Sequence, residues 1–415
     1  MNSLDALYGF LGLAASPVWA RKARSGWKER FGHSPVLAPP RAGRPRVLIH
    51  AVSVGEVSAL RTLVPLLADR VDLVVTATTD TGLKRATELF SGVATVARYP
   101  LDFSSSVHRF LDAVRPDAVA LVELELWPNF IAECRRRAIP VCVVNGRLSA
   151  RSFRGYRKIR RWIGRSFASL EFAAVQDTDY GERFTYMGVP ADRCLVTGSM
   201  KWDAAKIEDA VDGADQLAAD LGIDRARPLI VAGSTGPGEE AILQRACPAG
   251  AQLLCAPRKP ERFDEAAAAL PGCVRRSVQK ASARPAPRGS NRFLLDTIGE
   301  LRAAYSLADA VVVGRSFGDL HGSDPIEPIA LGKPTIIGPA VSDFATIVAE
   351  FESSHAIIRS TTDSIAGDLS ALLNDSARRD ALQTAGHACI RRNQGASRRH
   401  ADMIVSLVSK ASAPT

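Results

Sequence analysis

Short apolar segments alternate with amphipathic segments along most of the 415-residue chain, and this alternation constrains the fold more than any other feature. Apolar runs rich in Val, Ile and Leu are typical of parallel strands buried on both faces, and the longer periodic runs are typical of connecting helices. We therefore predict an α/β fold with two doubly wound, Rossmann-like domains that face each other across a cleft. Strands are predicted at 47–51, 73–76, 118–122, 141–145 and 172–176, then at 229–232, 252–256, 310–313 and 335–337, with helices at 83–90, 106–113 and 128–137.

The chain divides into five predicted regions. Its length fits two domains, since one domain usually holds about 100–200 residues. Residues 203–224 are rich in Ala and Asp and lack a strong apolar pattern, so we expect a linker and a surface helix there, and residues 285–289 are typical of a loop. The regions are an N-terminal segment at 1–31, a first domain at 32–205, a linker at 206–225, a second domain at 226–395 and a C-terminal helix at 396–415.

The stretch from His50 to Glu56, HAVSVGE, ends the first predicted strand and opens a helix. A strand that enters a helix through a glycine leaves free backbone N–H groups and the positive end of the helix dipole beside the sheet edge. The carboxylate of Glu56 is therefore a candidate for proton transfer at this edge. The alternative is that Glu56 only occupies the first helical turn, where acidic residues are common.

Two more loops at strand ends carry polar side chains. Residues 78–82 (TTDTG) follow the second strand, and residues 123–129 (ELELWPN) follow the strand at 118–122. Ligands of parallel sheets gather at the carboxyl ends of the strands, so we expect both loops on the ligand side. In an extended chain Glu123 and Glu125 point the same way, which is costly inside a protein unless substrate or solvent compensates. Glu125 also fits a simple acid at a helix start.

No cofactor is predicted. Residues 233–240 (GSTGPGEE) join a strand to a helix and superficially resemble a dinucleotide-binding loop. The spacing is not GxGxxG, and no acidic residue ends a strand about 20 residues later, which argues against NAD. The seven cysteines form no CxxC pair and are odd in number, so the sequence indicates neither a zinc site nor a disulfide framework.

Two segments combine apolar side chains with positive charge, in a chain of net charge +9. Residues 4–19 have an amphipathic helical pattern that is too short to span the roughly 30 Å hydrocarbon core comfortably and lacks the preceding basic residues of a signal peptide. The basic residues Arg21, Lys22, Arg24, Lys28 and Arg30 follow it, and residues 151–165 hold seven basic residues and no acidic one. We expect both segments to lie at an anionic membrane surface. The alternatives are a helix that packs on its own domain and an RNA-binding surface, although no RNA-binding motif accompanies the charge.

Eleven short motifs run in order along most of the chain: HAVSVGE, TTDTG, YPLD, ELELWPN, NGRLSARS, GYRK, VTGSMKWD, APRKPERF, DTIGEL, DPIEPIALGKP and NQGA. They resemble the lipid A-specific bacterial Kdo transferases of glycosyltransferase family 30, which move 3-deoxy-D-manno-octulosonic acid (Kdo) from CMP-Kdo to a lipid A precursor. The resemblance implies a GT-B glycosyltransferase of lipopolysaccharide biosynthesis that inverts the anomeric carbon and needs no metal. It also implies work at the cytoplasmic face of the inner membrane, with a peripheral or N-terminally anchored protein and no nucleic-acid partner.

The resemblance further implies roles for individual residues. The first domain would bind the acceptor and the second the nucleotide. Glu56 would be the general base for the acceptor hydroxyl and Glu123 a second essential acid, while Arg258 would contact the phosphate and Glu327 the ribose. Acceptor-binding residues would be Ser53, Gly55, Thr79, Glu125 and Arg147, and nucleotide-binding residues would be Pro257, Arg258, Lys259, Ile298, Gly299, Glu300, Asp324 and Glu327.

Four residues of the nucleotide half depart from the family pattern. Lys259 and Ser323 stand where the family usually has His, and Asp324 and Asp343 stand where it usually has Asn. A carboxylate at position 324 would repel a nucleotide phosphate unless Lys259 offsets the charge or the carboxylate has another partner. The donor therefore stays open between CMP-Kdo and another CMP- or UDP-activated sugar, and a non-catalytic membrane-surface protein is the remaining alternative.

Overall fold

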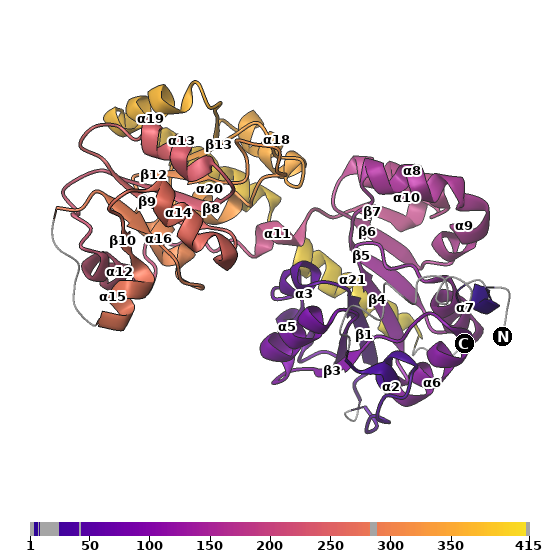
Figure 1. Ribbon diagram of the computed structural model, residues 1–415. Helices are drawn as coiled ribbons and strands as arrows, with labels where there is room; N and C mark the ends of the chain where they lie inside the picture. The colour runs from indigo at the N-terminus through magenta and orange to yellow at the C-terminus, as the bar shows by residue number, and fades with distance from the viewer. Residues whose placement is uncertain (1–3, 7, 9–24, 41–42, 283–288, 412–415) are drawn as a thin grey trace. The chain divides into compact units, whose positions relative to one another are not determined.

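The computed structural model describes residues 4–6, 8, 25–40, 43–282 and 289–411. The chain forms two compact units, which are described separately. Unit 1 comprises residues 1–204 and 393–415, and unit 2 comprises residues 205–392. Each unit is built on one seven-stranded sheet in which all neighbouring strands are parallel. The fold is therefore α/β with two Rossmann-like sheets, of the GT-B type (Figure 1).

The sheet of unit 1 has the strand order β3-β2-β1-β4-β5-β6-β7. The central strands are almost entirely apolar and fully buried because helices cover both faces. The strands are β1 (Arg46–Ala51), β2 (Asp72–Ala77), β3 (Thr95–Arg98), β4 (Ala118–Val122), β5 (Val141–Gly146), β6 (Phe172–Val175) and β7 (Cys194–Val196).

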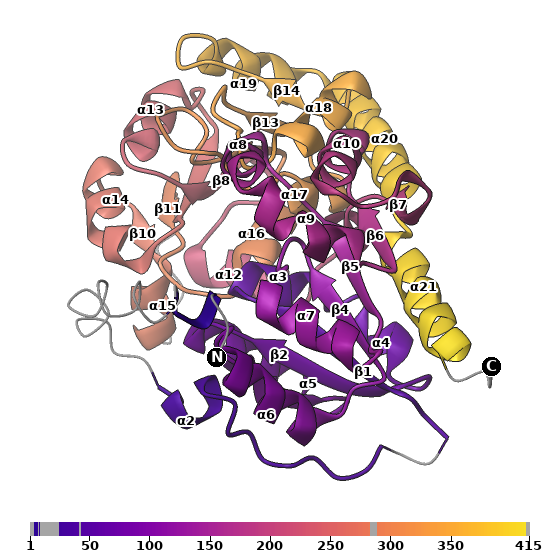
Figure 2. The same ribbon diagram turned by 90° about the vertical axis from the view of Figure 1, so that its right-hand side faces the viewer.

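Alternate residues of β1, β2, β4, β5 and β6 enter two separate apolar cores. Val47 and Ile49 face one core, and Leu48 faces the other, as the period-two geometry of a strand requires. The first core is closed by α3 (Val54–Ala59), α4 (Val64–Leu67), α5 (Asp80–Phe90) and α21 (Ala396–Ala411). The second is closed by α6 (Ser104–Val114), α7 (Pro128–Arg136), α9 (Arg160–Ala168) and α10 (Thr178–Met187), and Figure 2 shows α6 and α7 side by side on this face.

The C-terminal helix α21 is fixed to unit 1 at its first turn. Asp203, the last residue of α11 (Met200–Asp203), accepts hydrogen bonds from the backbone N–H groups of Gly395 and Ser397, both at 2.5 Å. The amide of Gln394 donates to the carbonyl oxygen of Trp202 at 3.1 Å. The motifs VTGSMKWD and NQGA therefore meet where the chain leaves unit 1 and where it returns. The remaining helices of unit 1 are α2 (Trp27–Arg30) and α8 (Ala150–Lys158), and a short 3-10 turn covers Ala191–Arg193.

The sheet of unit 2 has the order β10-β11-β9-β8-β12-β13-β14. Its strands are β8 (Leu229–Thr235), β9 (Gln252–Pro257), β10 (Val274–Arg275), β11 (Arg292–Leu294), β12 (Ala310–Val313), β13 (Thr335–Ile337) and β14 (Ile358–Arg359). Its helices are α12 (Ala214–Leu221), α13 (Glu239–Ala246), α14 (Phe263–Ala269), α15 (Arg276–Ser282), α16 (Leu301–Leu307), α17 (Ile326–Ala330), α18 (Ala345–Ser353), α19 (Ile365–Asn374) and α20 (Ser376–Asn393), with a 3-10 turn at Pro260–Arg262.

The structure contains every strand that the sequence predicts and adds five short ones. These five, β3, β7, β10, β11 and β14, lie at or next to a sheet edge, where fewer apolar residues are needed. The helical pattern that follows Ser53 is interrupted, since a turn separates α3 from α4. Within the expected linker, α12 buries Ala214, Leu217, Ala218 and Leu221, so this segment contributes apolar side chains to unit 2.

Most of the predicted N-terminal apolar helix lies outside the described residues, as do residues 285–288 of the predicted loop. Residues 4–6 and 8 are helical. Within the described ranges, no helix is long and apolar enough to cross a membrane. One expectation for the basic flank is wrong: Arg30 is 4% exposed and forms an ion pair with Asp80 at 3.1 Å, so it does not face a membrane.

Candidate active site

The predicted acceptor residues of unit 1 lie at the carboxyl ends of the parallel strands, which are called the carboxyl edge of the sheet below. Ser53 and Glu56 follow β1, Thr79 follows β2, Glu123 follows β4 and Arg147 follows β5. Because these strands are parallel, their carboxyl ends meet at the same edge. The structure thus brings together residues that are far apart in the sequence, at the edge where ligands of such sheets bind.

Glu56 is held by the loop that joins β1 to α3. Its Oε2 atom accepts a hydrogen bond from the backbone N–H of Val52 at 2.7 Å, and Oε1 accepts one from the hydroxyl of Ser53 at 2.8 Å. Ser53 is the N-cap of α3, and its Oγ accepts the backbone N–H of Glu56 at 3.4 Å. This reciprocal arrangement is close to a capping box. It fixes the carboxylate at the sheet edge, and a carboxylate has further lone pairs with which to accept a substrate hydroxyl.

Glu123 and Glu125 face the charge of Glu56. Burial, and then the charge of Glu56, raise the pKa of Glu123, while Arg147 and Lys201 act in the opposite direction. Burial and Glu56 also raise the pKa of Glu125 to about 7, although the indole N–H of Trp127 donates to its Oε2 at 3.0 Å. Three carboxylates that interact in this way are typical of a site that moves protons.

Two cations accompany the carboxylates. Arg147 is half-buried and its Nε–H donates to the hydroxyl of Tyr180 at 3.4 Å. Lys201 comes from α11, in the motif VTGSMKWD, and acts on the pKa of Glu123. The motif was recognised in the sequence, but Lys201 was assigned no role there, because its effect on Glu123 depends on where the chain runs after β7.

Thr79 holds the two neighbouring loops together. Its hydroxyl donates to the carbonyl oxygen of Val52 at 2.9 Å and accepts the backbone N–H of Gly82 at 3.0 Å. A Cβ on Gly82 would lie 2.7 Å from Thr79 Oγ1 and 2.9 Å from Val52 O, so only glycine allows this approach. The motif TTDTG therefore supports the loop that carries Glu56.

Gly55 differs from Gly82, because nothing within the described structure requires it. A Cβ placed on Gly55 would meet only the Oγ of Ser53, at 3.8 Å, and the residue is exposed. Glycine within a helix is unfavourable without such a requirement. Open space beside Glu56 is consistent with the close approach of a ligand.

His50, the first residue of the HAVSVGE motif, is a core residue. Burial lowers its pKa to about 3, so that the imidazole is neutral. Its ring stacks on Tyr99 with 3.6 Å between ring centroids, and Nδ1 lies 3.1 Å from Thr76 Oγ1. His50 therefore supports the sheet edge and does not take part in the carboxylate cluster.

The predicted phosphate-binding residues of unit 2 follow β9. Pro257 ends the strand and is buried, whereas Arg258 and Lys259 are exposed. The described residues provide no ion pair to either cation. The backbone N–H of Arg258 donates to Thr235 O at 3.1 Å, which fixes its position against the end of β8.

Some of the other predicted nucleotide-binding residues are exposed, and others have side chains that already bind neighbouring residues. Ile298 is 76% exposed and Gly299 has φ 96°, just before α16. Glu300 is bound by Arg276, with Nη2 2.9 Å from Oε1, so it can offer a nucleotide its backbone more readily than its carboxylate. Asp324 accepts the backbone N–H of Ile326 at 3.0 Å, and Glu327 Oε1 lies 3.7 Å from Arg302 Nη1.

Tyr305 links several of these residues. Burial raises its pKa, the charges of Glu327 and Asp324 raise it further, and Arg258 lowers it. The charges of Arg258, Asp324 and Glu327 therefore all act on this one buried phenol. The carboxylate of Asp324 accepts the backbone N–H of Ile326 at the start of α17. This hydrogen bond is the other partner that a carboxylate at position 324 was expected to need.

Two buried glutamates of unit 2 were missed by sequence reasoning as site residues. Glu239 is 3% exposed and accepts backbone N–H groups from Gly236, Arg315, Ser316 and Phe317, at 2.6–3.0 Å. Glu240 is 1% exposed and pairs with Arg262 through two contacts of 3.0 and 2.9 Å. The two side chains join the loops after β8, β9 and β12. The pair of acids at the start of a helix in GSTGPGEE was the only signal that could have revealed them.

Of the four departures from the family pattern, Ser323 has the most unusual setting. It is 8% exposed, and its hydroxyl has no hydrogen-bond partner among the described residues. Asp343 donates its backbone N–H to the carbonyl oxygen of His321 at 3.1 Å. Lys259 and Asp324 lie on different loops, after β9 and before α17 respectively.

Backbone strain marks the same two sheet edges. Glu123 (φ 60°) and Asn145 (φ 53°) lie at the ends of β4 and β5, and Ser234 (φ 57°) lies at the end of β8. Arg315 (φ 59°) follows β12. Non-glycine residues rarely adopt this conformation, and such residues cluster at functional sites. In the described chain, the other non-glycine residues with positive φ are Arg115, Ala138 and His355, which all follow helices.

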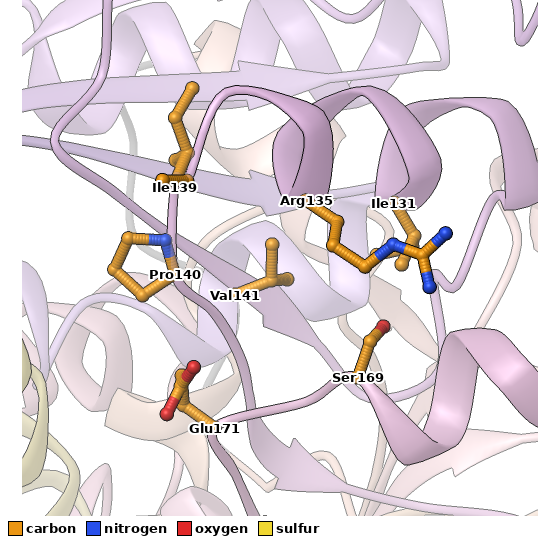
Figure 3. Close-up of a pocket in the computed structure, with 8 residues that line it drawn as sticks. Ile131, Arg135, Ile139, Pro140, Val141, Ser169 and Glu171 are labelled. Carbon is orange, nitrogen blue, oxygen red and sulfur yellow. The ribbon is translucent and has the colours of Figure 1, made fainter.

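A pocket elsewhere in unit 1 does not coincide with this site. It is lined by the end of α7, the start of β5 and the residues before β6, including Arg135, Val141 and Glu171 (Figure 3). These are the amino ends of the strands, opposite to the edge that holds Glu123. The described residues contain no group of three or more His, Cys, Asp or Glu side chains that could hold a metal ion.

Residues 25–204 match the family described as "3-Deoxy-D-manno-octulosonic-acid transferase (kdotransferase)". The 3-deoxy-D-manno-octulosonic acid transferase of Bordetella pertussis is 34% identical over 425 residues, which cover 96% of this chain and 97% of that protein. The enzyme of the same name from Haemophilus influenzae is 31% identical, covering 95% and 94%. The chain belongs to the Kdo transferase family. It is thus a Kdo transferase enzyme.

Solved structures of lower identity share the fold. A glycosyltransferase from Rickettsia africae has a TM-score of 0.59 at 11% identity, covering 89% of this chain and 99% of that one. HepE from Anabaena has a TM-score of 0.58 at 13% identity, covering 88% and 100%. These likenesses concern the GT-B type of fold alone.

Proposed function

We propose that this Kdo transferase moves Kdo from CMP-Kdo to a hydroxyl group of a lipid A precursor in lipopolysaccharide biosynthesis, with the acceptor bound by unit 1 and the cytidine nucleotide by unit 2. The observation that carries the proposal is the set of three carboxylates, Glu56, Glu123 and Glu125, at the carboxyl edge of the first sheet. Membership of the family supports the chemistry, and the position of the carboxylates supports the roles proposed for them.

Glu56 is the general base in this proposal. Its carboxylate takes the proton of the acceptor hydroxyl while the hydroxyl oxygen attacks the anomeric carbon of Kdo. The bond from that carbon to the phosphate oxygen breaks, and CMP leaves with the bonding electrons. The hydrogen bonds from Val52 and Ser53 support this role because they hold the carboxylate in one position. Glu123, with Arg147 and Lys201 near it, orients the reactants.

Unit 2 stabilises the leaving nucleotide. Departure of CMP leaves negative charge on the phosphate, which positive side chains and backbone N–H groups stabilise. Arg258 and Lys259 are exposed cations after β9, and Glu239 holds the neighbouring loops in place through their backbone N–H groups. Ile298, Gly299 and Glu300 offer backbone groups to the base, and Glu327 offers its carboxylate to the ribose.

We also propose that unit 1 attaches to an anionic membrane surface, at the cytoplasmic face of the inner membrane where the lipid acceptor lies. The basic surface, defined as the seven cations of α8 and α9, is exposed, and none of these cations forms an ion pair within the described structure. Trp162 is 73% exposed and Ile159 is 45% exposed between them. Exposed aromatic and basic side chains together are typical of membrane-surface binding. The cations are Arg151, Arg154, Arg157, Lys158, Arg160, Arg161 and Arg165.

The donor is tested by incubating the purified protein with CMP-Kdo and a tetraacylated lipid A precursor and weighing the product by mass spectrometry. We expect a mass increase of one or more Kdo residues. Titration calorimetry with CMP and UDP separates this proposal from the use of another nucleotide sugar. Preferential binding of UDP would contradict it, and would direct attention to Ser323 and Asp324.

A further inference from the structure

Two side chains of the described N-terminal residues, Asp5 and Tyr8, form polar contacts with unit 1. Asp5 is 5% exposed: its Oδ1 accepts the backbone N–H of Ser104 at 2.8 Å, and its Oδ2 accepts the hydroxyl of Ser104. Tyr8 donates its hydroxyl proton to Asp102 Oδ2 at 3.2 Å, and its ring contacts Phe103 edge to face. These contacts hold Asp5 and Tyr8 against the domain, which a membrane anchor alone would not require.

Asp5 completes a helix that lacks a cap of its own. The N-cap residue of α6 is Phe103, whose side chain cannot accept a hydrogen bond. Unpaired N–H groups at a helix start need such an acceptor, and a carboxylate is favoured there by the helix dipole. Asp5 supplies the acceptor from a position 99 residues away in the sequence.

The same network reaches the start of α7. The N-cap of α7 is Trp127, again without a side-chain cap. Asp102 accepts the backbone N–H of Asn129 at 3.0 Å and that of Phe130 at 2.8 Å. The side-chain amide of Asn129 in turn donates to Asp5 Oδ1 at 3.2 Å. Asp5 and Asp102 therefore act together on the first turns of α6 and α7, the two helices that lie side by side in Figure 2.

The first turn of α7 is the end of the loop that carries two of the site carboxylates. Glu123 directly follows β4, and Glu125 lies two residues later. Trp127 donates its indole N–H to Glu125. The start of this loop is fixed at the end of β4, where the backbone N–H of Glu123 donates a hydrogen bond to Val144 O at 3.1 Å. Leu124 and Leu126 of the loop pack against the apolar core, and its far end is fixed where α7 begins, at the backbone N–H groups that Asp102 binds.

We propose that Asp5 and Tyr8 are positioning residues of the acceptor site, which set the loop of Glu123 and Glu125 through Asp102 and Asn129. Asp5 and Tyr8 are then structural parts of the catalytic unit. The effect on transfer rests on the proposed function, whereas the effect on the loop can be measured without it.

The test uses the full chain with Asp5→Ala and, separately, Tyr8→Phe, which removes one hydroxyl. The acceptor is dispersed in detergent, so that attachment to a membrane is not needed for turnover. We expect kcat to fall about tenfold for Asp5→Ala and about threefold for Tyr8→Phe, because small displacements of catalytic groups are costly. Hydrogen–deuterium exchange should become faster at residues 123–131, and the affinity for CMP should not change.

Asp375→Ala is the matched control, since Asp375 caps α20 in unit 2 by accepting the N–H of Arg378 at 2.9 Å.

A double-mutant cycle sharpens the test. If Asp5 acts through Asn129, Asp5→Ala combined with Asn129→Ala should lower kcat no further than the stronger single change. Wild-type rates with detergent-dispersed acceptor, together with unchanged exchange at 123–131, would overturn the inference and leave Asp5 and Tyr8 without a role in positioning this loop. A wild-type chain that fails to transfer Kdo would contradict the proposed function, while the exchange measurement would still decide the inference.

Discussion

The two units have the same architecture but opposite chemistry at the carboxyl edges of their sheets. In unit 1 the edge holds three interacting carboxylates, and two of them have raised pKa values. In unit 2 two acids, Glu239 and Glu240, are buried and already paired, since Glu239 binds backbone N–H groups and Glu240 binds Arg262, while the cations Arg258 and Lys259 are exposed. A parallel seven-stranded sheet therefore provides only the place for a site, and the loop residues decide which half of a transfer reaction it performs.

The difference also explains how each edge tolerates its charge. Like charges in unit 1 remain near one another because protonation can relieve them, as the pKa of about 7 for Glu125 indicates. In unit 2 the cations are solvated, and a bound phosphate would neutralise them. Acid-base chemistry is thus expected in unit 1 and charge stabilisation in unit 2.

The largest equilibrium effect is expected for the cationic edge. Arg258→Ala should weaken CMP binding by about 1.5–3 kcal/mol, the range for hydrogen bonds to charged groups. Titration calorimetry measures this directly. Arg245→Ala, which removes an exposed cation from α13, is the control and should leave the affinity unchanged. Equal CMP affinities for the wild type and Arg258→Ala would mean that the phosphate binds elsewhere. The proposed difference between an acidic site in unit 1 and a cationic site in unit 2 would then be lost.

A smaller effect is expected for the acidic edge, as a dependence of stability on pH. The pKa of Glu125 is about 7 in the folded state and about 4.5 in the unfolded chain. Below pH 4.5 both states keep the proton, so the carboxyl group contributes no penalty. Between these pKa values the unfolded state ionises first, and the folded state loses stability as pH rises. Glu125→Gln should therefore raise the free energy of unfolding by about 1–3 kcal/mol at pH 8 and by nearly nothing at pH 4.

Denaturant unfolding at the two pH values, followed by tryptophan fluorescence, measures this difference. Glu182→Gln removes an exposed negative charge from the same unit and serves as the control. A gain at pH 4 as large as that at pH 8 would mean that the substitution acts through packing and not through charge.

The smallest effect concerns Gly55. Gly55→Ala should stabilise α3 by about 0.5–1 kcal/mol, because alanine is favoured over glycine in a helix and no atom obstructs its Cβ. Turnover should nevertheless fall, since the added methyl group occupies the open space beside Glu56. Gly367→Ala in α19, also unobstructed and exposed, should give a similar gain in stability with unchanged turnover. Unchanged turnover in Gly55→Ala would show that the acceptor does not approach this helix.

The sequence predicted the central strands and the loops that follow them, because buried parallel strands have a distinctive composition. Glu56, Glu123 and Glu125 could be assigned to one edge for the same reason. Edge strands such as β10 were missed because a strand of two residues is too short to show the alternation of apolar and polar side chains. Sequence reasoning also included Arg30 in a membrane-facing flank, whereas it is buried against Asp80, since an ion pair across 50 residues leaves no local pattern.

The contacts that support the site were harder to predict than the site itself. Glu239 reaches the loop after β12, 76–78 residues away, and Asp5 reaches α6 and α7 across 99 and 124 residues. Such long-range caps depend on the finished topology and on side-chain direction. A family motif indicates that such residues matter, but only the structure shows what they contact.

The central claim, that unit 1 carries the base and unit 2 the donor, is tested most directly by Glu56→Gln. The amide keeps the size of the side chain but cannot take the proton of the acceptor hydroxyl. With CMP-Kdo and a lipid A precursor, and product measured by mass, we expect turnover to fall by about two to four orders of magnitude while CMP affinity is nearly unchanged. Retention of more than about a tenth of the wild-type rate would contradict Glu56 as the base, and a much larger loss in Glu125→Gln would assign the proton transfer to that carboxylate instead.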